Sequence, residues 1–225
     1  MVVAHRGSSK AERENTILAF ERARRDGAAM VELDVRRTRS GELIIHHDAS
    51  IVGLGDIVDH DRAGLPDYVP TLDEALDACD PMLVNIEIKN MPDDPDFDPT
   101  ELVAQQVVAR LAQRGDGARM LISSFHAPTI AVVRRLNPGL QTGLLFTVPA
   151  VALHDVVAAG HSAIHPHHRA VTPDLVALAH RLGLAVNTWT VDDPARMREL
   201  ASFGVDAIIT NVPDVALRTL AEPLR

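Results

Sequence analysis

The chain has 225 residues, a net charge of −9 and 46% hydrophobic residues, the proportions of an ordinary globular protein with one large core. Aromatic residues make up only 3%, and no basic cluster carries interleaved aromatics, so the composition argues against nucleic-acid binding. No apolar run approaches the ~18 residues of a membrane span, and an acidic surface repels anionic lipids, so we expect no stable membrane association.

Short apolar runs alternate with helix-like stretches from one end of the chain to the other. The apolar runs predict buried strands, and the stretches between them predict helices because their apolar residues recur three to four positions apart. We expect strands at 2–5, 30–35, 82–88, 120–123, 142–146, 163–165, 185–189 and 207–210. We expect helices near 15–26, 71–79, 99–114, 127–136, 150–159, 173–182, 194–203 and 213–223.

Several of these helices begin with residues that cap a helix. Thr71 followed by Glu74 fits a capping box. Three further starts place a capping side chain before a proline at the first helical position: Asp98-Pro99, Thr172-Pro173 and Asp193-Pro194.

Strand–helix units that follow one another without a break predict an α/β fold, a closed (β/α)8 TIM barrel formed by residues 1–225 as a single domain. The apolar segment 43–45 follows the second strand too closely for a parallel crossover, which takes about a dozen residues. It therefore predicts a β-hairpin extension of that strand, and residues 49–70 predict a short insertion loop at the same end. The alternative is an open doubly wound sheet, but the glycine-rich turn typical of that fold is missing after the first strand.

Three carboxylates stand on the second and third predicted strands of the barrel. Glu32 and Asp34 are two residues apart and share the inward face, and Glu87 enters from the neighbouring strand. Adjacent buried carboxylates repel each other unless a cation binds or one is protonated. A ligand set made of oxygens alone predicts one hard divalent cation, Mg²⁺ or Ca²⁺. The alternative is a salt-bridge network with Arg36 or Lys89.

Two histidines and two cationic side chains lie at strand ends beside these carboxylates. His5 and His47 are the candidate catalytic acid and base, because phosphodiester hydrolysis moves two protons and imidazole titrates near neutral pH. Which histidine is the base is left open. Lys89, one of only two lysines, and Arg6 are the candidate ligands for a substrate phosphate.

Three more side chains are candidates for the substrate or for the shell around the metal. His165 and His167 belong to a histidine tract after the sixth strand, for which we favour a substrate contact over a zinc site. Trp189, the only tryptophan, ends the seventh strand. Its ring is a candidate for packing against a glycerol or choline group, and plain core packing is the alternative.

Eight short motifs occur in a fixed order between residue 2 and about residue 214: Val3-Ala4-His5-Arg6-Gly7, Glu14-Asn15-Thr16, Glu32-Leu33-Asp34-Val35, His47-Asp48, Glu87-Ile88-Lys89, Ser123-Ser124-Phe125, Trp189-Thr190 and Gly204-Val205-Asp206. In these motifs the chain resembles the glycerophosphodiester phosphodiesterase family, within the superfamily of phospholipase C-like phosphodiesterase TIM barrels. The resemblance covers nearly the whole chain.

The resemblance implies a metal-dependent enzyme, a phosphoric diester hydrolase that cleaves small glycerophosphodiesters to sn-glycerol 3-phosphate and an alcohol. It implies the metal ligands, acid–base pair and phosphate ligands given above, and adds Asn15 as a support of the metal shell. Arg13 and Asn211 depart from the family pattern, which has proline and aspartate there, and we expect neither to touch the chemistry. The segment 49–70 is shorter than the family's usual insertion, which leaves the alcohol preference open.

Two other functions stay open. Related barrels cleave lipid head groups in the manner of a lysophospholipase D or a phospholipase C, which requires an apolar rim that meets the bilayer. Ile51, Val52, Leu54 and Ile57 are the candidates for that rim. The third possibility is a barrel that binds a metal or a phosphate without turnover, for which a pair of histidines is not needed.

Cys79 is the only cysteine, which excludes an intramolecular disulfide and is typical of a reducing compartment. No basic region followed by an apolar segment and a cleavage site marks a signal peptide. We therefore expect a cytoplasmic protein. The sequence does not specify an oligomeric state.

Overall fold

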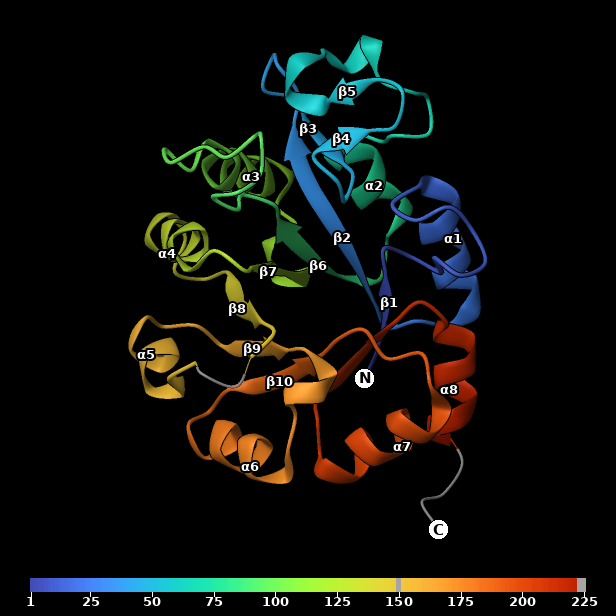
Figure 1. The fold of residues 1–225 in the computed structure, drawn as a ribbon, viewed down its shortest axis with the longest axis vertical. Coiled ribbons are helices and arrows are strands. Elements are labelled where there is room, and N and C mark those ends of the chain that lie inside the picture. Colours follow the sequence, from blue (N-terminus) through green and yellow to red (C-terminus); the bar gives the residue numbers. More distant parts are fainter. Residues whose placement is uncertain (149–150, 222–225) are drawn as a thin grey trace.

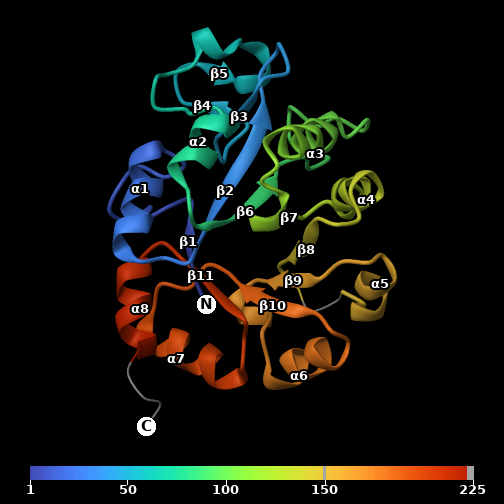
Figure 2. The ribbon, with the colours of Figure 1, turned by 180° about the vertical axis from the view of Figure 1, so that it is seen from behind.

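The computed structural model describes residues 1–148 and 151–221, and they form a closed barrel of parallel strands inside a ring of helices (Figures 1 and 2). Around the barrel the strands follow the order β1 (Val2–His5), β2 (Met30–Arg37), β6 (Leu83–Ile88), β7 (Met120–Ser124), β8 (Gln141–Phe146), β9 (Ala163–Pro166), β10 (Ala185–Thr188) and β11 (Ala207–Thr210). Because β11 pairs with β1, the sheet has no open edge at this point. The predicted (β/α)8 barrel is confirmed.

Each parallel strand is followed by a helix that packs on the outside of the sheet (Figure 2). The helices are α1 (Ile17–Asp26), α2 (Leu72–Ala78), α3 (Leu102–Arg114), α4 (Ala127–Leu136), α5 (Leu153–Ala158), α6 (Pro173–Arg181), α7 (Pro194–Phe203) and α8 (Pro213–Ala221). The predicted helices at 150–159 and 213–223 include residues 150, 222 and 223, which lie outside the described residues. None of the described helices combines the length and apolar character needed to cross a bilayer.

Most of the predicted helix caps are present. Thr71 and Glu74 form the capping box at α2. The Thr172 hydroxyl accepts a hydrogen bond from the Leu175 N–H at α6, and the Asp193 carboxylate accepts one from the Ala195 N–H at α7. These local signals need no tertiary partner, which explains why the sequence alone identifies them.

The predicted start of α3 at residue 99 is wrong, because tertiary contacts hold the residues before it in a turn. The Asn90 side chain accepts a hydrogen bond from the Asp98 N–H at 2.8 Å and donates one to the Glu101 carboxylate at 2.9 Å. Glu101 adopts a left-handed backbone conformation, φ 59°, and the helix begins only at Leu102.

The segment after β2 forms the predicted hairpin and a small insertion. β3 (Leu43–Ile45) pairs antiparallel with β2. Residues 49–70 hold a two-stranded sheet, β4 (Ser50–Ile51) with β5 (Gly55–Asp56), and two 3-10 turns, Ile57–Asp59 and Arg62–Gly64. This insertion lies beyond the far end of β2, at the top of Figure 1.

The insertion buries most of its apolar residues in a core of its own. Ile51 and Ile57 are buried, and Leu54 packs against them. Of the four residues predicted to form a membrane-facing rim, Val52 alone is fully exposed. The predicted rim is therefore wrong, because these side chains hold the insertion onto β3 instead of facing solvent.

The barrel interior carries polar side chains below its open end. Ser123 on β7 and His165 on β9 are fully buried or nearly so, and Gly143 lies on the strand between them. A Cβ atom at Gly143 would lie 2.5 Å from the His165 Nε2 atom, so the absence of a side chain on β8 makes room for the imidazole.

We predict that Gly143→Ala lowers the free energy of unfolding by about 1–3 kcal/mol, because the added methyl group overpacks the barrel against His165. Urea denaturation measures the change. Gly117→Ala is the matched control: its Cβ would only touch Leu140 at 3.4 Å, so the variant should be neutral or up to about 1 kcal/mol more stable. Equal stability of the two variants would contradict the packing argument.

Candidate active site

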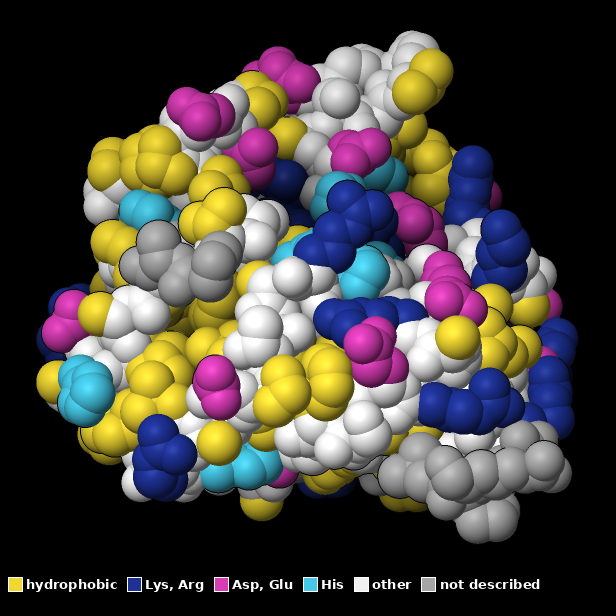
Figure 3. All heavy atoms as spheres, turned by 60° about the horizontal axis from the view of Figure 1, so that its bottom comes forward, with side chains coloured by type: hydrophobic (Ala, Val, Ile, Leu, Met, Phe, Trp, Pro, Cys, Tyr) yellow, Lys and Arg dark blue, Asp and Glu magenta, His cyan; other side chains and the backbone are white. Residues whose placement is uncertain are grey.

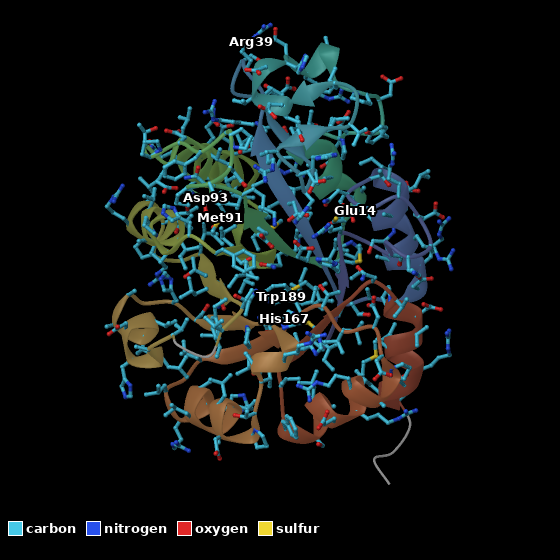
Figure 4. The ribbon with its side chains drawn as sticks, in the orientation of Figure 1. Glu14, Arg39, Met91, Asp93, His167 and Trp189 are labelled. Carbon is cyan, nitrogen blue, oxygen red and sulfur yellow. The ribbon has the colours of Figure 1, made fainter. Side chains whose placement is uncertain are left out.

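A cavity of about 160 Å³ opens at the carboxyl ends of the barrel strands, where (β/α)8 enzymes carry their active sites. It brings together seven of the predicted site residues: His5, Arg6, Glu32, His47, Glu87, Lys89 and Trp189. Figure 4 shows Trp189 and His167 beside each other near the centre of the barrel. In Figure 3, histidine and basic side chains lie side by side near the middle of the face, with acidic side chains around them.

The three predicted metal ligands lie together in the wall of the barrel. Glu32, Asp34 and Glu87 each offer a carboxylate oxygen, and these oxygens lie within 4.8 Å of one another. All three residues are buried, and the register of β2 with β6 places Asp34 opposite Glu87. The arrangement follows from side-chain alternation along two neighbouring parallel strands.

The two cations in the site are shared unequally among these carboxylates. The Lys89 ammonium lies 3.0 Å from Asp34 Oδ1 and also contacts the Glu87 carboxylate. The Arg6 Nε atom lies 3.1 Å from Asp34 Oδ2. Burial opposes the ionisation of Asp34, but Lys89 and Arg6 outweigh it and hold the Asp34 pKa below its ordinary value.

Glu32 is the carboxylate that the protein's own cations do not neutralise. Its Oε2 atom accepts a hydrogen bond from the Arg6 backbone N–H at 2.9 Å, whereas its Oε1 atom is buried without a hydrogen-bond partner among the described residues. Burial, and after it the charges of Asp34 and Glu87, raise the Glu32 pKa well above its ordinary value. An oxygen-only cluster with one uncompensated carboxylate fits a divalent cation of the Mg²⁺ or Ca²⁺ kind.

Of the alternative salt-bridge network with Arg36 or Lys89, only the part that involves Lys89 is present. Arg36 takes no part in the cluster, because its guanidinium binds Asp94 and Asp96 instead. Lys89 does pair with two of the carboxylates, but this pairing leaves Glu32 without a cation. The ion pairs of Lys89 therefore do not balance the whole cluster, which could still hold a metal ion.

The loop between β1 and α1 carries Asn15 to the metal cluster. The Asn15 amide donates a hydrogen bond to Asp34 Oδ2 at 2.8 Å, and its carbonyl oxygen accepts one from the Asp34 N–H at 3.3 Å. Arg6 and Asn15 both have left-handed backbones, with φ 53° and 56°. Gly7 lets this loop lie against α1, because a Cβ there would approach Ala19 within 2.6 Å.

His5 is oriented by a residue that we expected to lie away from the chemistry. The Asn211 amide donates to Asp192 Oδ2 at 2.7 Å, which turns its carbonyl oxygen toward His5 Nδ1, also at 2.7 Å. Because that oxygen only accepts, the proton of a neutral His5 ring resides on Nδ1. The expectation for Asn211 is wrong: it fixes the tautomer and leaves Nε2 directed to the cavity, 4.0 Å from Glu32 Oε2.

Burial lowers the pKa of His5 to about 4, and the Arg6 charge acts in the same direction. The imidazole is therefore neutral at pH 7 in the protein alone. A neutral ring with its proton on Nδ1 presents a free Nε2 lone pair, which can accept a proton.

His47 lies just beyond β3 and is held from two sides. Its Nδ1 atom lies 2.7 Å from Asp48 Oδ1, so the proton of the neutral ring again faces an acceptor. The Arg36 guanidinium donates a hydrogen bond to the His47 carbonyl at 2.9 Å. Burial lowers the pKa of His47 as well.

Aromatic side chains form the outer wall of the cavity. The Phe125 and Trp189 rings meet edge to face, with centroids 5.3 Å apart, and His167 packs on the other side of Trp189 at 5.1 Å. The Trp189 Nε1–H donates to the His165 carbonyl at 2.7 Å, which fixes the ring at the mouth. The Trp189 ring is anchored in the protein and also lines the cavity, so packing against a substrate group stays a prediction.

The structure places His165 and His167 differently. The His165 ring lies inside the barrel, is 1% exposed and pairs with the Asn187 amide at 3.0 Å. Neither His165 nor His167 is among the residues that line the cavity, but His167 packs next to Trp189, which lines it (Figure 4). A direct substrate contact is thus geometrically closer for His167 than for His165.

Residues 5–215 match the model of the glycerophosphoryl diester phosphodiesterase family. The chain belongs to this family. A glycerophosphodiester phosphodiesterase of Caldanaerobacter subterraneus is 31% identical over 96% of both chains, and one of Bacillus subtilis is 29% identical over 96% of this chain and 84% of its own.

Solved structures of the same family share the fold. A putative glycerophosphoryl diester phosphodiesterase of Silicibacter pomeroyi superimposes with a TM-score of 0.88 at 26% identity, covering 98% of this chain and 92% of its own. A phosphodiesterase of Oleispira antarctica, solved in complex with the product sn-glycerol-3-phosphate, has a TM-score of 0.91 at 23% identity, with 99% and 97% covered. At 23% identity, the likeness to the Oleispira protein shows a shared fold.

Sequence reasoning missed several residues that shape the site. Asn85 was within reach, because it precedes Glu87 by two positions on one strand face. Phe125 belongs to the Ser123-Ser124-Phe125 motif, but the sequence suggested no function for its ring. Asn211 was noted only as a departure from the family pattern, and Asp192 left no signal, because the contact of Asn211 with His5 comes from the other end of the chain.

We predict that Mg²⁺ or Ca²⁺ raises the melting temperature of metal-free protein, because the ion binds the folded carboxylate cluster and not the unfolded chain. Glu32→Gln should weaken or abolish the shift, since it removes the carboxylate without a cation of its own. Differential scanning fluorimetry against metal concentration measures both. Asp174→Asn, on the exposed start of α6, is the control and should keep the full shift. An unchanged shift in Glu32→Gln would argue against this ligand set.

Proposed function

We propose that the protein hydrolyses glycerophosphodiesters to sn-glycerol 3-phosphate and an alcohol, in the cytoplasm and with one divalent cation, Mg²⁺ or Ca²⁺. The observation that carries the proposal is a cavity lined by two histidines, Arg6 and Lys89 beside a cluster of three carboxylates, in a chain of this family. The named activity of the Caldanaerobacter relative supports the same assignment.

Glu32, Asp34 and Glu87 would hold the cation, with Asn15 keeping Asp34 in place. When bound, the ion supplies positive charge that polarises a phosphoryl oxygen. Arg6 and Lys89 line the same cavity and orient the phosphate of the diester.

His5 and His47 move the protons. The Nδ1 atom of His5 is hydrogen-bonded to Asn211, and that of His47 to Asp48. The Nε2 atom of each ring is therefore the one left to exchange a proton with the substrate. One histidine would take the proton from the attacking nucleophile, which is water or the glycerol 2-hydroxyl, and the other would deliver a proton to the oxygen of the departing alcohol. His5 is the last residue of β1 and His47 lies just beyond β3, so the two imidazoles enter the cavity from different strands.

The dimensions of the site favour a small water-soluble diester over a membrane lipid. The cavity measures about 160 Å³, and the insertion beside it buries Ile51 and Ile57. The apolar rim that would have supported cleavage of a lipid head group is therefore not on the surface. A barrel that only binds phosphate gives no reason for two oriented imidazoles beside the carboxylate cluster.

We predict release of sn-glycerol 3-phosphate from glycerophosphocholine or glycerophosphoethanolamine that stops in EDTA and returns with Mg²⁺ or Ca²⁺. An enzyme-coupled assay for glycerol 3-phosphate follows the reaction, and lysophospholipid micelles serve as the comparison substrate. Full activity in excess chelator, or faster cleavage of the micelles than of the deacylated diester, would contradict the proposal.

We predict that His47→Ala and His5→Ala each lower kcat by about 10²–10⁴-fold, the usual contribution of general acid–base catalysis. Both variants should keep the metal-induced rise in melting temperature, since neither residue is among the proposed ligands. His180→Ala is the control, because His180 lies on α6 paired with Asp206, away from the cavity. Near-normal turnover in either of the first two variants would remove that histidine from the mechanism.

A further inference from the structure

Asn85 is a buried polar side chain in the wall of the cavity, and the proposed mechanism leaves it without a role. It lies on β6, two residues before Glu87 on the same inward face, and its Cα pairs with that of Glu32. The residue is 1% exposed and lines the cavity. Neither its amide nitrogen nor its carbonyl oxygen has a hydrogen-bond partner in the described part of the chain.

An amide without either partner is uncommon in a protein interior, because burial strips it of water and leaves two polar atoms uncompensated. Glu32 Oε1, on the neighbouring strand, shares this property. The two side chains lie at paired positions of β2 and β6, and both line the cavity. The unpartnered atoms therefore gather where a ligand would enter.

The chemistry of the amide identifies the group that fits it. An asparagine side chain offers a donor and an acceptor side by side. A phosphate oxygen would use only the donor, and an ammonium group only the acceptor. A hydroxyl group accepts one hydrogen bond and donates another, so it satisfies both atoms of Asn85.

A second cavity, of about 270 Å³, indicates which half of the substrate lies near Asn85. It shares His47, Glu87, Lys89 and Phe125 with the first cavity and continues past Asp48 and Met91. The Asp48 side chain is 71% exposed, so this cavity opens to solvent. Figure 4 shows Met91 and Asp93 on the loop after β6, apart from the central Trp189 and His167.

The shared residues include Lys89, the ligand assigned to the phosphate. A diester bound there has one half on the Asn85 side, inside the barrel, and the other half along Asp48 and Met91. The enclosed side suits the glycerol half, which all glycerophosphodiesters have in common. The open side suits the alcohol half, which varies among them.

We propose that Asn85 is a specificity-determining residue that binds a hydroxyl group of the substrate's glycerol half, while the alcohol to be released occupies the outer cavity. The inference rests on the proposed function and deepens it.

The test compares glycerophosphocholine with propylphosphocholine, in which a propyl chain replaces glycerol and no hydroxyl remains. Asn85→Ala should lower kcat/KM for glycerophosphocholine by about 10- to 100-fold, the effect of leaving a bound polar group unpaired. For propylphosphocholine the same variant should change kcat/KM less than about threefold. Asn85→Leu, which has a similar volume and no polar atoms, should give the same pattern and guards against a folding defect.

Ser123→Ala is the matched control. Ser123 lies opposite Glu87 on β7, is buried and also lacks a hydrogen-bond partner among residues 1–148 and 151–221, but it is not among the residues that line the cavity. This variant should keep the preference of the wild-type protein for glycerophosphocholine.

Calorimetry with metal-loaded protein gives a readout without turnover. The wild-type protein should bind sn-glycerol 3-phosphate at least 10-fold more tightly than propyl phosphate, and Asn85→Ala should bind the two with similar affinity. Equal losses on both diesters would assign Asn85 to a structural or water-holding role and overturn the inference, as would no loss on either. If the wild-type protein cleaves neither diester, the proposed function fails, and the calorimetric comparison still decides on Asn85.

Discussion

Repulsion among three buried carboxylates is the constraint on which the rest of the site depends. Glu32, Asp34 and Glu87 stand within 4.8 Å of each other in an interior where charges are weakly screened. The chain compensates them unequally: Asp34 has Lys89 and Arg6, Glu87 has Lys89, and Glu32 has one backbone N–H. A divalent ion held by the three carboxylates would complete this balance, and His5, His47, Arg6 and Lys89 line the cavity beside them.

The barrel could be predicted because its strands are covered on both sides. Parallel strands of this kind appear in a sequence as short apolar runs, and the caps at Thr71 and Asp193 mark helix starts without outside help. The start of α3 could not be predicted in this way, because Asn90 holds residues 98–101 in a turn that local propensity does not encode. The same holds for the insertion, where Ile51 and Ile57 read as surface residues until their own core is seen.

In the site, too, local patterns predicted some residues and tertiary contacts supplied the others. Alternation along a strand placed Glu32, Asp34 and Glu87 on one face, and the ends of neighbouring strands brought the histidines near them. The partners that orient those histidines come from elsewhere in the fold. Asn211 reaches His5 across the closure of the barrel, and no pattern in the sequence relates residues 206 positions apart. Sequence therefore supplied the candidate reacting groups, whereas the structure was needed for the hydrogen-bond partners that orient them.

Arg36 joins two parts of the protein that serve different purposes. Its guanidinium holds the carbonyl of His47 and, through Asp94 and Asp96, the loop after β6. One rigid strand thus anchors both the proton-transferring residue and a wall of the outer cavity. Because the anchor grips backbone and loop carboxylates, side chains such as Met91 are free to change without disturbing His47. On the proposed binding mode, substitutions at Met91 would change the surroundings of the departing alcohol while Arg36 keeps the backbone of His47 in place.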